Sequence, residues 1–186
     1  MDIKTLFPVI LRAYDPAWPQ WFAEEKARLE QLIGGEHIAR ISHYGSTAVP
    51  GLLAKPTVDI LLEIHPGIDM GKLKTALPHP EYIRMTDEDR ADVPPERLMF
   101  VKGYTERGFA EKVYHIHVRY AGEWDELLFR DYLIAYPETA AEYAALKRSL
   151  LVKFEYDRDG YTAAKGAFIR EYTARARQVN KERKKQ

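Results

Sequence analysis

Three features that the chain lacks narrow the classes of protein to which it can belong. It has no cysteine, which excludes disulfide bonds and thiolate metal sites and fits a reducing compartment. It has no net charge, because 28 basic and 28 acidic residues cancel, so no overall field favours nucleic acid or an acidic membrane. It has no apolar run near the ~18–20 residues that a bilayer requires, and no apolar segment follows Met1 to Lys4 as in a signal peptide. We expect a cytoplasmic protein without a nucleic-acid partner or a membrane.

The composition that is present is that of a folded protein of modest size. Hydrophobic residues make up 46% and charged residues 30% of the 186 residues. This length suits one domain with a sizeable core and is short for two. We therefore predict a single domain over residues 1–186, with the sheet at about residues 14–121 and a helical part at about 122–180.

Hydrophobic periodicity predicts an α+β domain. Alternating residues indicate strands at 37–43, 57–64, 97–104 and 112–120. Helical spacing indicates helices at 16–33, 70–77, 124–135, 137–154 and 161–179. Asp15 and Pro16 are typical of the start of the first helix, Gly34 of its end, and Asp69 of the next cap. The acidic, proline-containing stretch 87–96 indicates a loop that can act as a lid. A small mixed sheet with flanking helices and a C-terminal helical layer is therefore expected.

A glycine-rich turn lies between the first two predicted strands, where residues 43–63 read HYGSTAVPGLLAKPTVDILLE. Gly45 allows a positive φ and a close approach of the backbone, and Ser46 offers a hydroxyl beside free amides. With Lys55 near its far end, such a loop suits a phosphate. It is not a Walker A sequence, because the pattern GxxxxGK[ST] is absent. An ordinary turn is the alternative interpretation.

Asp59 is a carboxylate inside an otherwise apolar predicted strand. If it were buried without a partner, it would cost roughly several kcal/mol. It must therefore meet water, a cation, or donors from the preceding loop. A functional carboxylate and a structural one that bonds the amides of the turn at 47–51 both remain open.

Two histidines lie on one face of the last predicted strand. His115 and His117 are two residues apart, so their side chains project to the same side. With Asp59 on a neighbouring strand they would form a two-histidine, one-carboxylate set that suits a divalent metal, and His43 is a candidate fourth ligand. The alternative is that they are ordinary half-buried hydrogen-bonding residues.

The stretch HYGSTAVPGLLAKPTVDI resembles the signature of the GrpB family, also called UPF0157. Further matches are YHIHV at 114–118, LLFRDYL at 127–133, and the pairs Tyr143 with Lys147 and Tyr161 with Lys165. The likeness extends from about residue 14 to residue 169. It implies a divergent branch of the nucleotidyltransferase superfamily, with an α+β fold.

In that superfamily a Gly-Ser loop precedes an Asp-x-Asp strand, and a later strand adds a third carboxylate that helps to hold two Mg²⁺ ions. Gly45, Ser46 and Asp59 match this pattern. The second carboxylate is missing, because Thr57 and Leu61 flank Asp59 at the two candidate positions. Histidines stand where the third acid is expected, and imidazole favours Zn²⁺, Mn²⁺ or Fe²⁺ over Mg²⁺.

Three functions follow from the resemblance and from this departure. The first is metal-dependent transfer of a nucleotidyl group from a nucleoside triphosphate to a small acceptor, with Mg²⁺ or Mn²⁺, or with Zn²⁺. Its expected residues are catalytic Asp59 and His117, substrate-binding Gly45, Ser46 and Lys55, and metal ligands Asp59, His115, His117 and His43. The second is a non-catalytic nucleotide-binding or folding-accessory module, as GrpB-like domains fused to dephospho-CoA kinases imply. The third is a metal-dependent hydrolase. A second acid near Asp59, from Glu63 or from 87–96, would favour the first.

Overall fold

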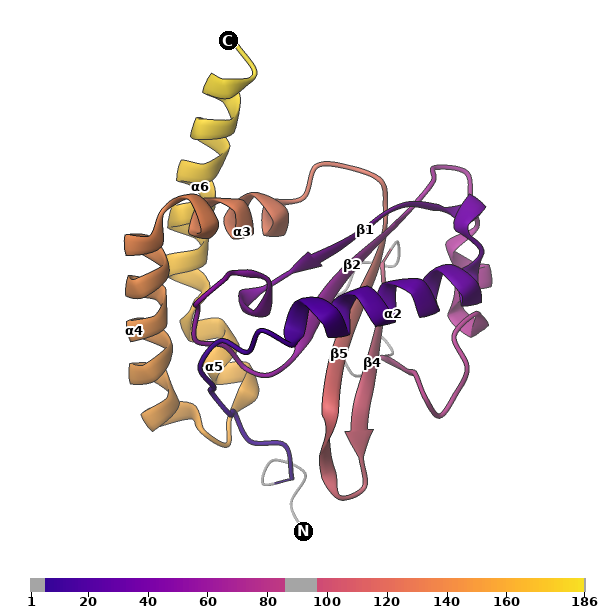
Figure 1. The fold of residues 1–186 in the computed structure, drawn as a ribbon, viewed down its shortest axis with the longest axis horizontal. Helices are drawn as coiled ribbons and strands as arrows, with labels where there is room; N and C mark the ends of the chain where they lie inside the picture. The colour runs from indigo at the N-terminus through magenta and orange to yellow at the C-terminus, as the bar shows by residue number, and fades with distance from the viewer. Residues whose placement is uncertain (1–5, 86–96, 186) are drawn as a thin grey trace. The chain divides into compact units, whose positions relative to one another are not determined.

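The structure is a computed structural model that describes residues 6–85 and 97–185 (Figure 1). The predicted lid at 87–96 lies outside the described residues. The chain has the expected α+β class, with a five-stranded mixed sheet and flanking helices. It forms two compact units: unit 1 consists of Met1–Asp15, Tyr44–Pro56 and Trp124–Gln186, and unit 2 consists of Pro16–His43 and Thr57–Glu123.

Unit 2 is built on a five-stranded sheet with the order β1-β2-β5-β4-β3. Its strands are β1 Ile38–Tyr44, β2 Val58–Ile64, β3 Ile83–Met85, β4 Leu98–Thr105 and β5 Gly108–Tyr120, and only the last residue of β1, Tyr44, belongs to unit 1. β2 pairs with β5 in parallel, whereas β4 pairs antiparallel with both β5 and β3, so the sheet is mixed. The four predicted strands are confirmed. The short edge strand β3 was not predicted.

The register of β2 and β5 brings their polar positions together. Asp59 pairs with His115, and Leu61 pairs with His117. Because side chains alternate along a strand, these positions share one face of the sheet. The opposite face carries the core of unit 2, where Ile60 and Ile116 are fully buried.

The first helix of unit 2, α2 Trp18–Ile33, begins later than the sequence indicates. Its N-cap is Ala17, with no hydrogen bond from a capping side chain, and a proline lies in its first turn. The prediction of Asp15 as the cap is therefore wrong, because the apolar periodicity starts with the buried Trp18 rather than with the Asp-Pro pair. The helix ends as predicted at Gly34, whose φ of 88° is the left-handed conformation that glycine favours.

Two short 3₁₀ helices complete the described part of unit 2. They are η1 Gly35–His37 and η3 Met70–Thr75. Asp69 caps η3 as expected, since its Oδ1 accepts a hydrogen bond of 2.8 Å from the amide of Gly71. The segment predicted as a longer helix is therefore a short 3₁₀ turn.

The helices of the C-terminal part of the chain belong to unit 1. They are α3 Asp125–Ala135, α4 Pro137–Phe154, α5 Arg158–Ala164 and α6 Gly166–Arg183, together with η2 Ser46–Ala48. The sequence predicted one last helix, but the chain breaks between α5 and α6, where Gly166 has a poor intrinsic preference for helix. Among the described residues, no helix is both long and apolar enough to cross a membrane.

The core of unit 1 joins segments that are far apart in the sequence. Val49 and Leu52, on either side of Pro50 and Gly51, are buried against Leu133 and Tyr143 from the helices. The N-terminal segment adds a short bridge, with Arg12 and Ala54 exchanging two backbone hydrogen bonds of 2.8 and 3.0 Å. The turn that carries Gly45 and Ser46 is therefore anchored inside unit 1.

Candidate functional site

Asp59, His115 and His117 come together on the sheet of unit 2. Each offers one ligand atom, and these atoms all lie within 4.8 Å of one another. Within the cluster, His115 Nδ1 lies 3.3 Å from Asp59 Oδ1. The side chains are 14% exposed for His115 and 27% exposed for Asp59, so the cluster is shielded but remains open to solvent. The proximity expected from the strand pattern is therefore observed.

Tyr104 on β4 extends this cluster from the other side of His115. Its hydroxyl lies 2.7 Å from His115 Nε2, and the two rings are stacked. If Tyr104 accepts a hydrogen bond from Nε2–H, the lone pair of Nδ1 faces the Asp59 carboxylate, and two acceptors then need a cation between them. If Nδ1 carries the proton instead, His115 donates to Asp59 and accepts from Tyr104. A bound metal ion would select the first arrangement, in which Tyr104 orients the ligand.

Substitution of Tyr104 by phenylalanine tests this orienting contact. The change keeps the ring and removes only the hydroxyl that meets His115. Because outer-shell partners of metal ligands typically contribute about 10–100-fold to affinity, Tyr104→Phe is expected to weaken Mn²⁺ or Zn²⁺ binding by that factor. Calorimetric titration measures the affinity. Equal affinity of the parent and Tyr104→Phe would show that the hydroxyl does not orient His115.

The donor set decides which metals the cluster fits. Two imidazole nitrogens and one carboxylate oxygen suit Zn²⁺, Mn²⁺ or Fe²⁺, whereas Mg²⁺ prefers oxygen ligands throughout. The residues present therefore fit a transition metal better than the Mg²⁺ of a carboxylate-rich site.

The other acids and the other histidine of the predicted set have different surroundings. The ring of His43 stacks on Phe22, with centroids 5.0 Å apart, and His43 is not a member of the cluster. Glu63, the second acid of β2, accepts hydrogen bonds of 2.5 and 3.0 Å from Arg40 and one of 3.2 Å from the amide of Gly122. The candidate second acids at 87–96 lie outside the described residues.

The predicted phosphate-binding residues lie in unit 1. Gly45 has a φ of 74°, the left-handed conformation that the sequence anticipates, and Ser46 begins the 3₁₀ turn η2. Lys55 extends toward the face of Tyr161, with its Nζ 5.8 Å from the ring centroid. The structure thus confirms the backbone conformation of the turn.

Lys147 is a residue of this region to which sequence analysis assigned no function. It lies on α4, is only 2% exposed, and its Nζ donates hydrogen bonds to Ser46 Oγ, at 3.0 Å, and to the carbonyl of Leu53. Burial, followed by the nearby charges of Lys165, Lys55 and Arg148, lowers the pKa of Lys147 from 10.5 to about 7. The sequence offered two signals, a lysine within the apolar stripe of a predicted helix and its pairing with Tyr143 in the family resemblance.

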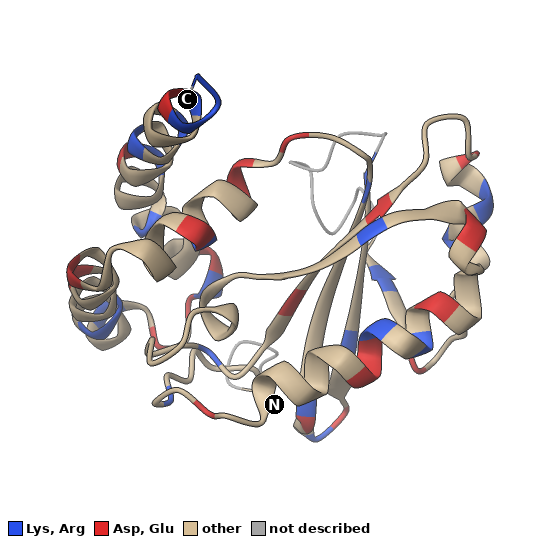
Figure 2. Cartoon of the chain, turned by 45° about the horizontal axis from the view of Figure 1, so that its top comes forward, with Lys and Arg blue, Asp and Glu red and all other residues tan. Residues whose placement is uncertain are grey.

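A cavity of about 620 Å³ opens beside the same turn, entirely within unit 1. Its apolar wall comes from α3, α4 and α6, and its polar groups include Ser46 and Thr173. The lining residues are Tyr44, Gly45, Ser46, Asp125, Glu126, Phe129, Arg130, Leu133, Tyr143, Ile169, Arg170, Thr173 and Arg177. Arg177 Nε donates a hydrogen bond of 2.8 Å to Asp125 Oδ1, so these two opposite charges of the cavity lining neutralise each other. Figure 2 shows Lys and Arg interspersed with Asp and Glu along the helices.

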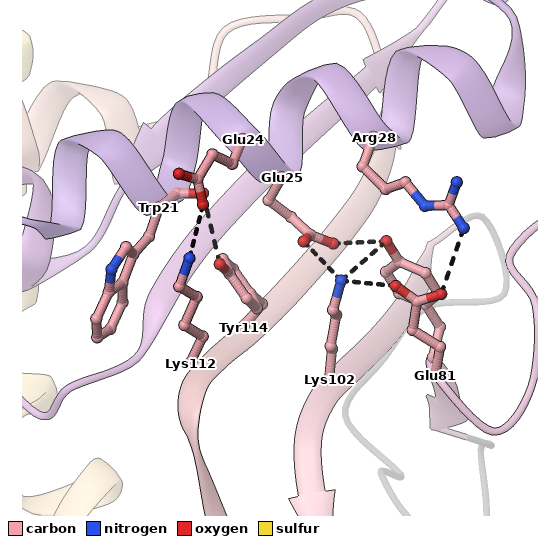
Figure 3. A network of polar contacts seen from close by, with 9 residues as sticks. Trp21, Glu24, Glu25, Arg28, Glu81, Lys102, Lys112 and Tyr114 are labelled. Atoms are coloured by element: carbon pink, nitrogen blue, oxygen red, sulfur yellow. Dashed lines mark hydrogen bonds and ion pairs between the residues drawn. The ribbon is translucent and has the colours of Figure 1, made fainter.

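A second polar network holds α2 against the sheet of unit 2 (Figure 3). Glu25, only 4% exposed, accepts hydrogen bonds from Tyr82, at 2.6 Å, and from Lys102, at 2.8 Å. Lys102 also meets Glu81 at 2.8 Å. Each charged group of this network has a partner, so its place in the fold is structural.

Comparison with known proteins identifies the family of the chain. A profile of the GrpB protein family matches residues 8–175. The chain is 37% identical to a UPF0157 protein of Pseudomonas aeruginosa, over 87% of this chain and 65% of that protein. It is 30% identical to a dephospho-CoA kinase of Mycolicibacterium paratuberculosis, over 91% of this chain and 46% of that protein. The chain thus spans less than two thirds of the length of either relative.

A solved structure has the same fold. The crystal structure of the conserved protein GrpB from Enterococcus faecalis superposes with a TM-score of 0.78 and 28% sequence identity. The similarity covers 92% of this chain and 99% of that one.

Proposed function

Because the chain belongs to the GrpB family, we propose that it is a metal-dependent protein that acts on nucleotides, transferring a nucleotidyl group from a nucleoside triphosphate to a small acceptor. The observation that carries the proposal is the convergence of Asp59, His115 and His117, whose ligand atoms lie within 4.8 Å of one another. The relative that bears the name dephospho-CoA kinase is compatible with a role related to nucleotides.

Each residue of the site has a proposed role. Asp59, His115 and His117 hold the cation, and Tyr104 keeps His115 oriented toward it. When bound, such a cation supplies charge to offset that of the reacting phosphates. Gly45, Ser46 and Lys55 are the proposed phosphate-binding residues, and they belong to unit 1.

Titration of the protein with Mn²⁺ tests the metal site. Asp59→Asn and His117→Ala each remove one ligand, so we expect affinity to fall by more than the roughly 10–100-fold that loss of an outer-shell partner costs. Glu111→Gln on β5, an exposed residue outside the cluster, is the matched control and should bind Mn²⁺ as the parent does. Unchanged affinity in the two ligand variants would remove the cluster from the function.

Turnover is tested with the same proteins. The parent is incubated with Mn²⁺, each nucleoside triphosphate and a mixture of small acceptors, and release of pyrophosphate is measured. We expect release by the parent and by Glu111→Gln, and none by Asp59→Asn. Release that survives in Asp59→Asn would place the reaction elsewhere.

A second function is favoured by one observation, the single carboxylate of the cluster. Transfer with two metals typically uses several carboxylates, and the nearby acid of β2, Glu63, is engaged by Arg40. A non-catalytic nucleotide-binding or folding-accessory module needs no second acid. Tight binding of a nucleoside triphosphate without any pyrophosphate release would identify this alternative.

A further inference from the structure

We propose that Lys147, acting through the hydroxyl of Ser46, makes the cavity of unit 1 a proton-linked binding site for an anionic ligand with an apolar body. The inference deepens the proposed function and rests on it for one point only, that this ligand is a nucleotide. All the residues that it uses belong to unit 1, so it is independent of the metal cluster of unit 2.

The contact between the two side chains is short and enclosed. Lys147 Nζ lies 3.0 Å from Ser46 Oγ, and it also bonds the carbonyl of Leu53 and lies 4.6 Å from the ring centroid of Tyr143. Lys147 is 2% exposed and does not line the cavity, whereas Ser46 and Tyr143 do. A ligand in the cavity therefore meets the hydroxyl of Ser46, and the amine lies behind it.

The protonation of Lys147 decides what that hydroxyl can offer. A protonated amine has only donors, so it donates to Ser46 Oγ, and the Ser46 proton is then available to a ligand. A neutral amine has a lone pair that can accept a hydrogen bond from the Ser46 hydroxyl, and the hydroxyl then presents only oxygen lone pairs to the cavity. The first state attracts an anion, and the second repels it.

Because of its surroundings, Lys147 gains or loses its proton near neutral pH. The charges that act on it are the cations Lys165, Lys55 and Arg148, and together with burial they lower its pKa to about 7. Lys165 and Lys55 also lie over the ring of Tyr161, with their Nζ atoms 4.6 and 5.8 Å from its centroid. An anion that enters next to Ser46 would offset this positive charge and draw a proton onto Lys147.

The cavity wall indicates the class of ligand. Phe129, Leu133, Tyr143 and Ile169 form an apolar surface, and Arg130, Arg170 and Arg177 add guanidinium groups. The acids Asp125 and Glu126 also line it, so the positive charge is local rather than general. Such a wall fits a molecule with a flat or apolar portion and a phosphate group, as in a nucleotide.

Binding of ATP in EDTA, without any metal, tests the inference. Calorimetry between pH 7.5 and 9 covers a range in which the phosphates, whose last pKa is about 6, are already ionised. We expect affinity to fall by up to about tenfold per pH unit, with about one proton taken up per ATP at the upper end. Measurement in two buffers with different ionisation enthalpies gives the proton uptake directly. Adenosine, which lacks the phosphates, should bind with no such pH dependence.

Variants separate the switch from the rest of the cavity. Lys147→Met and Ser46→Ala should each abolish the pH dependence, by removing the amine or the hydroxyl that it controls. Arg170→Gln should weaken ATP binding and leave the slope unchanged. Lys153→Met, on the same helix but outside the cavity lining, is the matched control and should behave as the parent.

The outcomes distinguish this inference from the proposed function. Affinity for ATP that is independent of pH in the parent, a slope that persists in both Lys147→Met and Ser46→Ala, or no binding in EDTA would each overturn the inference. The role of the metal cluster would then be decided by the Mn²⁺ titration alone. Asp59→Asn should still bind ATP in the absence of metal. If the parent protein binds ATP in this proton-linked way but does not bind Mn²⁺, the inference holds and the proposed function is wrong.

Discussion

Replacement of Lys102 by methionine is expected to lower the free energy of unfolding by about 3–5 kcal/mol, the usual cost of removing one partner from a buried ion pair. Lys102 supplies the positive charge beside Glu25, which is only 4% exposed. Methionine has a similar length but no charge, so the Glu25 carboxylate would keep Tyr82 and lose its counter-ion. Urea unfolding followed by tryptophan fluorescence measures the change, because Trp18 and Trp21 lie on the same helix as Glu25.

The chain provides a matched control for this experiment. Lys112 on β5 also reaches α2, where it meets Glu24 at 2.6 Å (Figure 3). These two side chains are 40% and 48% exposed. Exposed pairs contribute at most about 1 kcal/mol, so Lys112→Met should have a small effect. Equal losses in Lys102→Met and Lys112→Met would show that burial of Glu25 does not set the strength of the network. A double variant, Glu25→Leu with Lys102→Met, should recover part of the loss.

The free energy of unfolding should rise as the pH increases from 7 to 9.5. Burial and neighbouring cations lower the pKa of Lys147 from 10.5 to about 7 in the folded chain. Between these values the unfolded chain binds one more proton than the folded chain, so deprotonation favours folding. The gain amounts to about 3 kcal/mol over this range, at roughly 1.4 kcal/mol per pH unit.

Lys147→Met isolates this contribution. The variant lacks the titrating group, so its free energy of unfolding should not show the increase with pH that Lys147 causes. The difference between the two pH profiles gives the contribution of Lys147 to stability. Lys153→Met, which removes a lysine from the same helix outside the buried cluster, should keep the slope of the parent. The same slope in the parent and in Lys147→Met would mean that Lys147 keeps its proton up to its ordinary range.

Local sequence patterns were sufficient to predict four strands of the five-stranded sheet and most of the helices. The alternation at 57–64 and 112–120 correctly placed Asp59 and His117 on one face, because a strand has a fixed period of two. The pairing of β2 with β5 in parallel could not be predicted in the same way, since it depends on the whole topology. The break between α5 and α6 was missed because one glycine is a weak signal within a helical pattern.

The candidate residues that were missed depend on contacts between different elements of the fold. Tyr104 on β4 contacts His115 on the adjacent strand β5, and Lys147 contacts Ser46, which is 101 positions away in the sequence. A tyrosine in a strand and a lysine in a helix are common, so neither position carries a local signal of function. Gly45, Ser46 and Asp59 stood out because each breaks the pattern of its own segment.

The interleaving of the two units has a consequence for truncated or proteolysed forms of the chain. The backbone passes between the units four times, after residues 15, 43, 56 and 123. A fragment that ends at residue 123 keeps both segments of unit 2, but it also keeps residues 44–56 without the helices on which they pack. Val49 and Leu52, which are 2% and 3% exposed in the whole chain, would then face water and favour self-association. Complementation by an added fragment 124–186 would be needed to cover them again.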